Sequence, residues 1–373
     1  MTEVAGGRIP LFRPLIEAEA LTAVKDAFES GWLGLGPRTA EFERAFADYI
    51  GAPYCVGTSS CSAALQLALR SLDLPPGSEV ITTALTFVAS NQIILHERLR
   101  PVFADVDPTT GNLDPASVAT HMSDKTRALL LVHYGGYPCD LDELYRLARD
   151  REIPVIEDCA HACGAVYRGT RIGSHGQLHA FSFHAIKNLP MGEGGALTVR
   201  DGELDRRLRK LRWFGIDADS YSRLSAGGSR WDYSLSELGY KHYLDDLHAS
   251  IGLVQLGVVD AGNRRRAEIA ARYRSSLAEV AGIELLQEGP DRQSSYHLMC
   301  ILAAERDDLI RCLAEHGVDT GVHYRPSYYY PMFDSEPLAG VENFWRRAVS
   351  LPMHLHLKDE QVDRIVSAIA EGW

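Results

Sequence analysis

The segment ALLLVH at residues 128–133 decides the fold, because it is apolar along almost its whole length. A strand that is apolar on both faces is typical of the centre of a parallel sheet with helices on both sides. Helical patterns alternate with further strand-like segments around it: strands are expected near residues 54–58, 79–83, 101–106 and 154–158, and helices over 62–72, 87–95 and 140–151. This alternation predicts an α/β fold built on a mostly parallel sheet.

The pattern changes after residue 203, where strands become sparse. From about residue 282 strands and helices mix again, which is typical of a smaller α+β unit. We therefore expect a large α/β domain over residues 1–260 and a small C-terminal α+β domain over residues 261–373. The intervening segments are expected as a basic helix over 203–213, an ordered loop over 217–235, and helices over 245–261 and 263–280.

Composition restricts the class of protein. The 373 residues include 38 Lys and Arg and 50 Asp and Glu, a formal net charge of −12, which argues against a general nucleic-acid or membrane-surface binder. We see neither a signal pattern at the N-terminus nor an apolar run long enough to cross a bilayer. Seven cysteines at scattered spacings favour reduced thiols over a disulfide framework. We expect a cytoplasmic protein.

Two pairs of residues are of types that often bind metal ions, but neither pair is spaced as in a known kind of metal site. Cys159 and Cys163 form a C-x3-C pair, and His354 and His356 form an H-x-H pair. No second ligand pair stands at zinc-site spacing from the cysteines, so small buried residues beside a strand are the favoured interpretation. A surface strand end is the favoured interpretation of the histidines. We expect no metal.

Lys187 lies in the segment AFSFHAIKNLPMGEGG, residues 180–195, between an aromatic strand pattern and a glycine-rich turn. Most lysines are solvated surface charges, but an ordinary surface lysine is less expected between a strand and a glycine-rich turn. An amine in a partly dry pocket has a lowered pKa and can attack a carbonyl to form a Schiff base. That chemistry is what enzymes of pyridoxal 5′-phosphate (PLP) need.

Two other features fit the same cofactor. The loop GTSSCS, residues 57–62, leads into a helix and suits a phosphate, although Ser and Thr are also ordinary N-caps. Asp158 ends a strand and could pair with a protonated pyridine nitrogen, or could cap a turn. The segment between Asp158 and Lys187 is long enough for about one further strand. Two adjacent strands would therefore bring both side chains to one crevice.

Two single residues extend the pattern. Ser182 could supply another phosphate hydroxyl, because it lies five residues before Lys187. Phe87 follows a strand and could stack on a ring face, or could pack in the core as most lone aromatic residues do.

The order of these motifs resembles that of the sugar aminotransferases of the DegT/DnrJ/EryC1/StrS family, which are PLP enzymes of fold type I with a mixed, mostly parallel sheet. The resemblance covers nearly the whole chain. The most specific match is the segment 182–195, and the others are residues 31–43, 59–69, 86–89, 156–161 and 238–256. The chain departs from the family at Cys61-Ser62, where Gly-Thr is usual, and at Lys241, where an Asn donated across a dimer is frequent.

The resemblance implies a role for each matched position. Lys187 would be the Schiff-base lysine and proton shuttle, and Asp158 would hold the pyridine nitrogen. A dehydratase branch of the family has histidine at the position of Lys187, so the lysine favours transamination. The other cofactor-binding positions implied are Cys61, Ser62 and Ser182 at the phosphate, Phe87 on the ring, His161 near its phenolic oxygen, and Lys241 from a partner subunit.

On the substrate side, the resemblance implies that Trp32 and the segment His323-Tyr324-Arg325 border the substrate and its nucleotide. Arg325 could pair with a diphosphate. The tyrosines that follow, at residues 328–330, could stack on or hydrogen-bond to the substrate. A tyrosine-rich packing turn is the alternative interpretation of this segment.

The resemblance therefore implies a homodimer with shared sites. It would transfer an amino group from glutamate or glutamine to a nucleotide-linked 3- or 4-keto-6-deoxy sugar. Three alternatives stay open: an aminotransferase of a cyclic keto-polyol such as scyllo-inosose, a PLP-dependent sugar dehydratase, and a regulator of this fold without turnover. The last expects a missing Lys or Asp, and the chain has both. We expect no nucleic acid or membrane as a partner.

Overall fold

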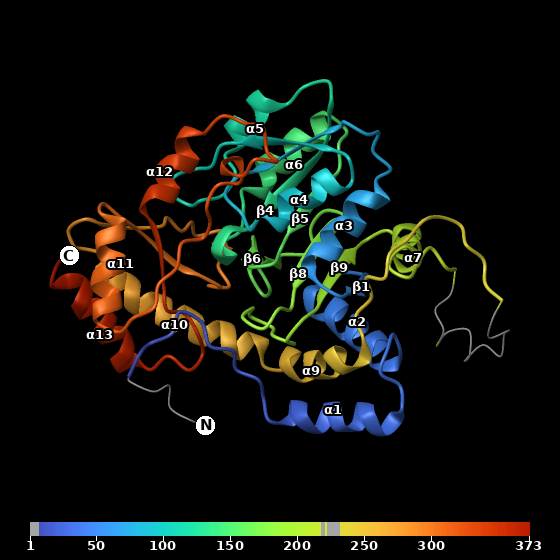
Figure 1. Cartoon of the computed structure of the whole chain (residues 1–373), viewed down its shortest axis with the longest axis horizontal. Helices are drawn as coiled ribbons and strands as arrows, with labels where there is room; N and C mark the ends of the chain where they lie inside the picture. Colours follow the sequence, from blue (N-terminus) through green and yellow to red (C-terminus); the bar gives the residue numbers. More distant parts are fainter. Residues whose placement is uncertain (1–6, 218–220, 222–231) are drawn as a thin grey trace.

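The computed structural model describes residues 7–217, 221 and 232–373 (Figure 1). Most of the loop expected over 217–235 lies outside these residues. A seven-stranded sheet has the order β1-β9-β8-β5-β4-β2-β3, and its strands are β1 (Tyr54–Thr58), β2 (Glu79–Thr83), β3 (Arg100–Ala104), β4 (Thr126–Val132), β5 (Val155–Asp158), β8 (Leu178–Ser182) and β9 (Gly195–Val199). Strands β3, β2, β4, β5 and β8 run parallel, and β9 is antiparallel to both its neighbours. The predicted mostly parallel sheet is confirmed.

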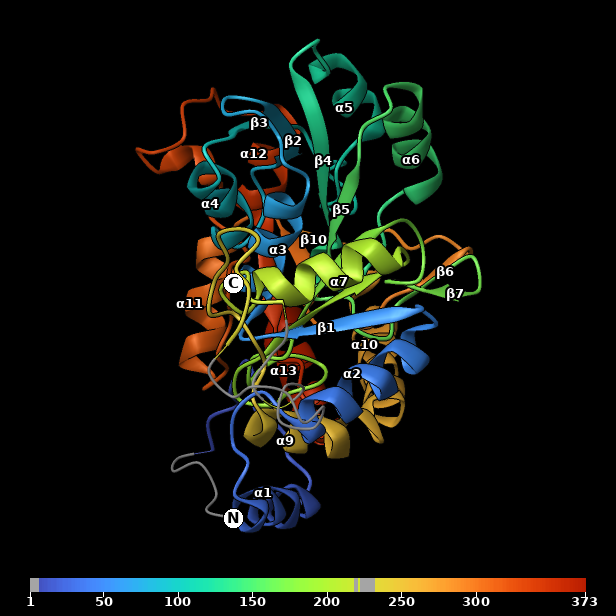
Figure 2. The same cartoon turned by 90° about the vertical axis from the view of Figure 1, so that its right-hand side faces the viewer.

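Helices cover both faces of this sheet, which explains the apolar segment 128–133. Leu129 and Leu131 of β4 belong to the core on the side of α2 (Pro37–Ile50), α5 (Pro115–His121) and α6 (Leu141–Asp150). Leu130 and Val132 belong to the core on the side of α3 (Cys61–Ser71), α4 (Ala89–His96) and α7 (Gly202–Leu211). Successive side chains of a strand point to opposite faces, so both faces need apolar residues. Figure 2 shows β1 between α2 and α7.

The C-terminal part has a core of its own. Its antiparallel sheet has the order β10-β12-β13, formed by β10 (Ile283–Leu285), β12 (Met299–Ala303) and β13 (Ala348–Leu351). Helices α10 (Val259–Leu277), α11 (Arg306–Glu315) and α13 (Asp359–Ala370) pack on it, and Ile9 from the N-terminus joins the same core. The domain boundary at residue 260 stays a prediction. His354 is 3% exposed, so the surface position predicted for it is wrong.

The remaining elements connect these two parts. Helix α1 (Glu19–Ser30) packs against α9 (Asp246–Leu256), and α10 continues from α9 toward α11 and α13 (Figure 1). No helix in the described ranges has both the length and the apolar character that crossing a bilayer requires. All seven cysteines are free thiols. The other elements outside the two main sheets are α12 (Ala339–Arg347), two 3₁₀ turns (Tyr134–Gly136 and Ser327–Tyr329), and a small sheet of β6 (Val166–Tyr167), β7 (Thr170–Arg171) and β11 (Arg292–Gln293).

Candidate active site

A cavity of about 470 Å³ lies at the carboxyl ends of the parallel strands. Asp158 ends β5, and Lys187 lies in the loop that joins β8 to β9; both line this cavity. The loop is held by backbone hydrogen bonds, including Lys187 N to the His184 carbonyl at 2.9 Å and Met191 N to the Phe183 carbonyl at 2.8 Å. The predicted convergence of Asp158 and Lys187 is therefore present in the fold, as expected at this edge of a parallel sheet.

Hydrogen bonds fix the carboxylate of Asp158, which is buried. Its Oδ2 accepts from Ser90 Oγ at 2.7 Å, and its Oδ1 accepts from the backbone N–H of Ala160 at 3.0 Å. Ser90 Oγ is also 3.0 Å from Thr86 Oγ1. The thiol of Cys61 lies 3.7 Å from Oδ1, and burial, reinforced by Asp158, raises the pKa of this thiol well above its usual value. The thiol is thus a donor, and the carboxylate keeps one orientation.

Lys187 stands among neutral imidazoles. Its Nζ lies 3.4 Å from His297 Nε2. Burial and the charge of Lys187 hold the pKa values of His161 and His297 well below the usual range, and lower the pKa of His323 to about 4. Burial lowers the pKa of Lys187 itself to about 8, although Asp158 opposes the shift. A substantial neutral fraction of this amine near physiological pH makes it a capable nucleophile.

A polar cradle forms where α3 begins. Ser60 caps this helix by accepting from the Ala63 N–H at 3.1 Å, and Ser62 and Ser182 also line the cavity. A Cβ at Gly195 of β9 would lie 2.3 Å from the Ser60 carbonyl carbon, so only glycine lets the helix start approach the sheet this closely. Free N–H groups and hydroxyls at a helix N-terminus suit a phosphate. The thiol of Cys61 points to Asp158, which leaves its backbone N–H for the cradle.

Aromatic groups form the remaining wall. Phe87 lines the cavity with 58% of its surface exposed, so the alternative of a core position is wrong. Tyr324 makes an edge contact with Phe87 at 6.0 Å between ring centroids, and its hydroxyl lies 3.1 Å from His161 Nε2. Nδ1 of His161 is buried and has no hydrogen-bond partner in the part of the chain that the structure describes. Together with the cradle, the carboxylate and the amine, these groups fit PLP.

Three of the predicted site residues do not line this cavity in the single chain. The indole N–H of Trp32 donates to the Leu35 carbonyl at 2.9 Å. Lys241 is exposed and pairs through its backbone with Trp213. The exposed Arg325 lies over the Tyr329 ring, 5.4 Å from its centroid, whereas its neighbours His323 and Tyr324 do line the cavity. The roles expected of Trp32, Lys241 and Arg325 stay predictions.

Sequence reasoning missed two residues next to the expected site. His297 is separated from Lys187 by 110 positions, and no local pattern distinguishes it. Ser90 was detectable in principle, because it lies three residues after Phe87 at the start of α4 and lines the same cavity.

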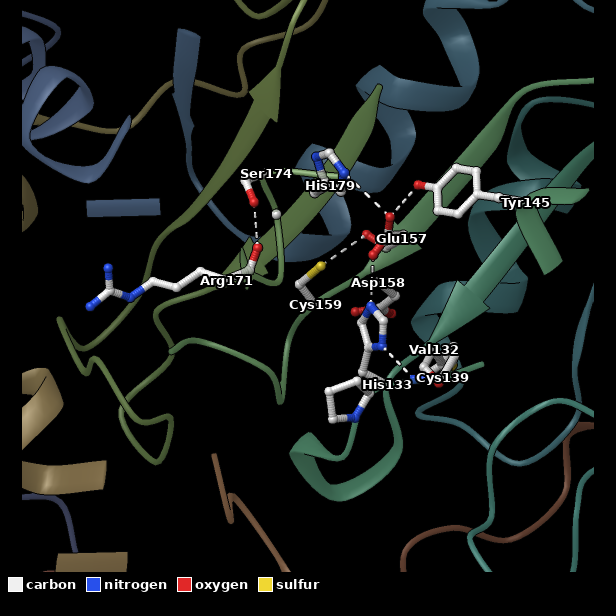
Figure 3. A network of polar contacts seen from close by, with 12 residues as sticks. Val132, His133, Cys139, Tyr145, Glu157, Asp158, Cys159, Arg171, Ser174 and His179 are labelled. Carbon is white, nitrogen blue, oxygen red and sulfur yellow. Dashed lines mark hydrogen bonds and ion pairs between the residues drawn. The ribbon is translucent and has the colours of Figure 1, made fainter. Parts of the chain in front are cut away.

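Behind the site, on the other face of β5, Glu157 is the centre of a buried polar network (Figure 3). Its carboxylate accepts a hydrogen bond from the Tyr145 hydroxyl and lies 2.9 Å from His133 Nε2 and 3.3 Å from His179 Nε2. Burial alone would raise the pKa of Glu157, but the two histidines outweigh it and hold that pKa well below its usual value. The network fixes the strand that carries Asp158.

The same network brings three possible metal-ligand atoms, from His133, Glu157 and Cys159, within 4.8 Å of one another. Burial raises the pKa of the Cys159 thiol to about 12, so the thiol keeps its proton and is a poor ligand. Both carboxylate oxygens of Glu157 already have polar partners. We therefore interpret the cluster as a hydrogen-bond network.

Comparisons with known proteins agree with the geometry. The sequence model of the DegT/DnrJ/EryC1/StrS aminotransferase family matches residues 14–370. AtS13 from Actinomadura melliaura is 39% identical and has a TM-score of 0.93 over 99% of this chain and 100% of that chain. The sugar aminotransferase CalS13 from Micromonospora echinospora is 36% identical, with a TM-score of 0.91 over 98% and 100% of the two chains.

A curated relative is similar to this chain in sequence to about the same degree. The spore coat polysaccharide biosynthesis protein SpsC from Bacillus subtilis is 36% identical over 376 residues, which cover 97% of this chain and 96% of SpsC. Matching solved structures include a PLP-form and a form with pyridoxamine 5′-phosphate (PMP).

Proposed function

The chain belongs to the DegT/DnrJ/EryC1/StrS aminotransferase family, is a PLP-dependent aminotransferase of fold type I, and on that premise we propose its reaction. It transfers an amino group from glutamate or glutamine to a nucleotide-linked 3- or 4-keto-6-deoxy sugar. The observation that carries the proposal is the cavity in which the Lys187 amine and the Asp158 carboxylate meet. One water supplies the oxygen with which the donor leaves as a 2-oxo acid, and the ketone oxygen of the sugar leaves as one water.

Each residue of the cavity has a role in this proposal. Asp158 holds the pyridine nitrogen of PLP, supported by its fixed orientation through Ser90. Phe87 stacks on the ring and His161 binds near its phenolic oxygen. The phosphate takes the cradle of Ser62, Ser182 and the N–H groups at the start of α3, including that of Cys61.

Lys187 acts in both half-reactions. PLP, when bound, supplies an electron-accepting ring beside the amine nitrogen. Nζ of Lys187 would hold the cofactor covalently in the resting protein, and once free it would take the proton from the donor α-carbon. In the second half-reaction Nζ delivers a proton to the carbon that was the sugar ketone. The pKa of about 8 supports both roles, because the amine exchanges protons easily near neutral pH.

A homodimer with shared sites is part of the proposal. Several apolar side chains stand exposed on α1 and in the segment before α9, among them Leu21 at 79% and Leu238 at 84%. Exposed apolar surface of this kind is typical of an interface. Trp32, Lys241 and Arg325 lie outside the cavity of their own chain, and we propose that Lys241 serves the partner subunit's phosphate and that Trp32 and Arg325 border the nucleotide.

We also propose the domain division expected from the sequence, with a large cofactor-binding domain over 1–260 and a small domain over 261–373. The separate apolar core around β12 and β13 supports it. A cytoplasmic location is supported by the seven free thiols, which a reducing compartment maintains.

A substrate panel tests the proposed reaction. Purified protein in the PMP-form is incubated with nucleotide-linked 3-keto and 4-keto sugars and with scyllo-inosose, and the return of PLP is followed by chromatography. Return with a nucleotide keto-sugar, together with an aminated product by mass spectrometry, is the expected result. Return with scyllo-inosose alone would establish the cyclic polyol as substrate, and a deoxygenated product without a new amine would establish a dehydratase.

A further inference from the structure

A second cavity, of about 300 Å³, adjoins the first and shares Ile186 and Lys187 with it. Three arginines line it, Arg13, Arg265 and Arg266, against one carboxylate, that of Glu17. This lining is cationic in a chain whose formal net charge is −12. Among the described residues, the first cavity has no arginine in its lining. A concentration of guanidinium groups next to the reactive lysine suits an anion.

Arg266 is a buried cation without an ionic partner. Its Nη1 donates to the backbone carbonyls of Met353 at 3.2 Å and Tyr296 at 3.4 Å. No carboxylate forms an ion pair with it in the described part of the chain. Burial lowers the pKa of Arg266 to about 10, and no neighbouring acid opposes the shift. A buried guanidinium without a counter-ion is costly to the fold and gains most from an anion that enters the cavity.

The other two arginines of the cavity, Arg13 and Arg265, differ in whether their guanidinium groups already have ionic partners. Arg265 already forms ion pairs with Asp359 at 2.6 Å and Glu268 at 3.2 Å. Arg13 is partly buried at the cavity wall, and within the described residues no carboxylate stands at ion-pair distance from it. The unused donors of the cavity therefore belong to Arg13 and Arg266.

Both arginines are connected to the reactive lysine through His297. Tyr296, whose carbonyl accepts from Arg266, precedes His297, and His297 Nε2 is 3.4 Å from Lys187 Nζ. Phe12, which precedes Arg13, stacks on the His297 ring with 5.7 Å between centroids. An anion held by the two arginines therefore lies close to the amine chemistry.

We propose that Arg13 and Arg266 bind a carboxylate of the amino donor while its amino group reaches the cofactor site at Lys187. This inference rests on the proposed function, because it assumes an amino-acid donor. A cavity of about 300 Å³ is at the small end of ligand sites and suits a five-carbon dicarboxylate better than a nucleotide. Guanidinium groups bind carboxylates through two parallel hydrogen bonds, which also fixes the direction of the donor.

Kinetics of the separate half-reactions test the inference. With PLP-loaded protein and glutamate, R13Q and R266K are expected to raise KM by about tenfold or more, because a charge-assisted hydrogen bond is lost or displaced. KM for the keto-sugar with PMP-loaded protein stays within about twofold. R272Q is the matched control, because Arg272 is an exposed arginine of α10 whose ion pairs with Asp359 and Asp363 lie outside the cavity.

Calorimetry with glutarate gives a readout that needs no turnover. Glutarate has the two carboxylates of glutamate and no amine, and it is expected to bind the PLP-loaded wild type and R272Q but to lose affinity in R13Q and R266K. R13Q keeps the test interpretable if R266K does not fold. Alanine as a donor locates the carboxylate: a rise in KM for both donors assigns the α-carboxylate, and a rise for glutamate alone assigns the distal one.

Unchanged KM for glutamate and unchanged glutarate affinity in both variants would overturn the inference while amine transfer by the wild type stands. A rise in KM for the nucleotide keto-sugar alone would also overturn it, because the arginines would then bind the nucleotide phosphates. A wild type that transfers no amine from any donor defeats the proposed function instead, and loss of glutarate binding in the variants would still identify the carboxylate site.

Discussion

Ser90 donates a 2.7 Å hydrogen bond to Oδ2 of Asp158, and its hydroxyl is itself 3.0 Å from Thr86 Oγ1. All three side chains are buried. This hydrogen bond joins α4 to β5 at the site, because Ser90 belongs to the first turn of the helix and Asp158 ends the strand. The carboxylate that we assign to the pyridine nitrogen therefore depends on a hydroxyl from a different element.

Ser90→Ala is expected to weaken the binding of PLP. A hydrogen bond to a charged group contributes about 1.5–3 kcal/mol, so the affinity falls by about tenfold or more if the orientation of Asp158 is lost. Equilibrium dialysis of PLP against the purified variant measures this. Ser71→Ala is the control, because Ser71 is also a buried serine, and its hydroxyl bonds only the Ala68 carbonyl within α3. Equal affinity of Ser90→Ala and wild type would contradict the role of Ser90.

Gly195→Ala is expected to displace the start of α3 from β9. The new Cβ would lie 2.3 Å from the Ser60 carbonyl carbon and 2.6 Å from the Cys61 nitrogen, and backbone atoms cannot give way as side chains do. We expect a loss of about 1–3 kcal/mol in the free energy of unfolding, together with weaker PLP binding. Urea titration and dialysis measure the two effects. Gly34→Ala, whose Cβ would meet the Tyr243 hydroxyl at an ordinary 3.9 Å, should leave both unchanged.

Lys187→Ala is expected to abolish covalent attachment of PLP and to lower the rate of amine transfer by at least about a hundredfold, because the nucleophile and the proton-transfer group are the same amine. Intact-mass measurement after borohydride reduction detects the attachment. Lys125→Ala should keep the mass increase, since Lys125 is exposed and precedes β4, at the end of the strand opposite to the cavity. A reduced adduct in Lys187→Ala would show that another amine forms the link.

Covalent attachment of PLP should depend on pH with the pKa of Lys187. Burial lowers this pKa to about 8, and only the neutral amine attacks the aldehyde. The attachment rate should rise about tenfold per pH unit below about 8 and level off above it, whereas a free lysine derivative continues to rise to about pH 10. Stopped-flow mixing of apo-protein with PLP measures the profile. A rise that continues to pH 10 would contradict the lowered pKa.

Glu157→Gln is expected to destabilise the fold by about 3 kcal/mol, because the variant removes the buried carboxylate that His133, His179 and the Tyr145 hydroxyl contact. The pKa of Glu157 is lowered in the fold, so its contribution is complete at neutral pH and is lost as the pH falls below about 4. Urea unfolding at pH 7 and at low pH should therefore show a difference from wild type that shrinks on acidification.

Glu143→Gln supplies the contrast for this stability test. Glu143 forms ion pairs with Arg146 on the exposed face of α6, where water and salt screen them. We expect no measurable change in its urea midpoint. If both variants behaved alike, the buried network would have no special part in stability.

The sequence alone determined the sheet and singled out the two groups that we propose as catalytic. An apolar β4 requires helices on both faces, and an alternation of strands and helices requires a mostly parallel sheet, because both follow from which faces must be buried. Lys187 and Asp158 were predictable for the same reason. Each lies near the end of a recognisable strand, and parallel strands deliver their carboxyl ends to one edge.

The tertiary structure alone decided what surrounds these groups. His297 reaches Lys187 across 110 positions, and the cavity of Arg13 and Arg266 joins the N-terminal segment to α10. Sequence patterns report local periodicity and burial, whereas these contacts arise from packing between distant segments and leave no periodic trace. The same limit applies to His354, whose burial depends on the segments that fold over it. The local pattern thus predicted which groups line the cavity, and the packing of distant segments decided which charges surround them.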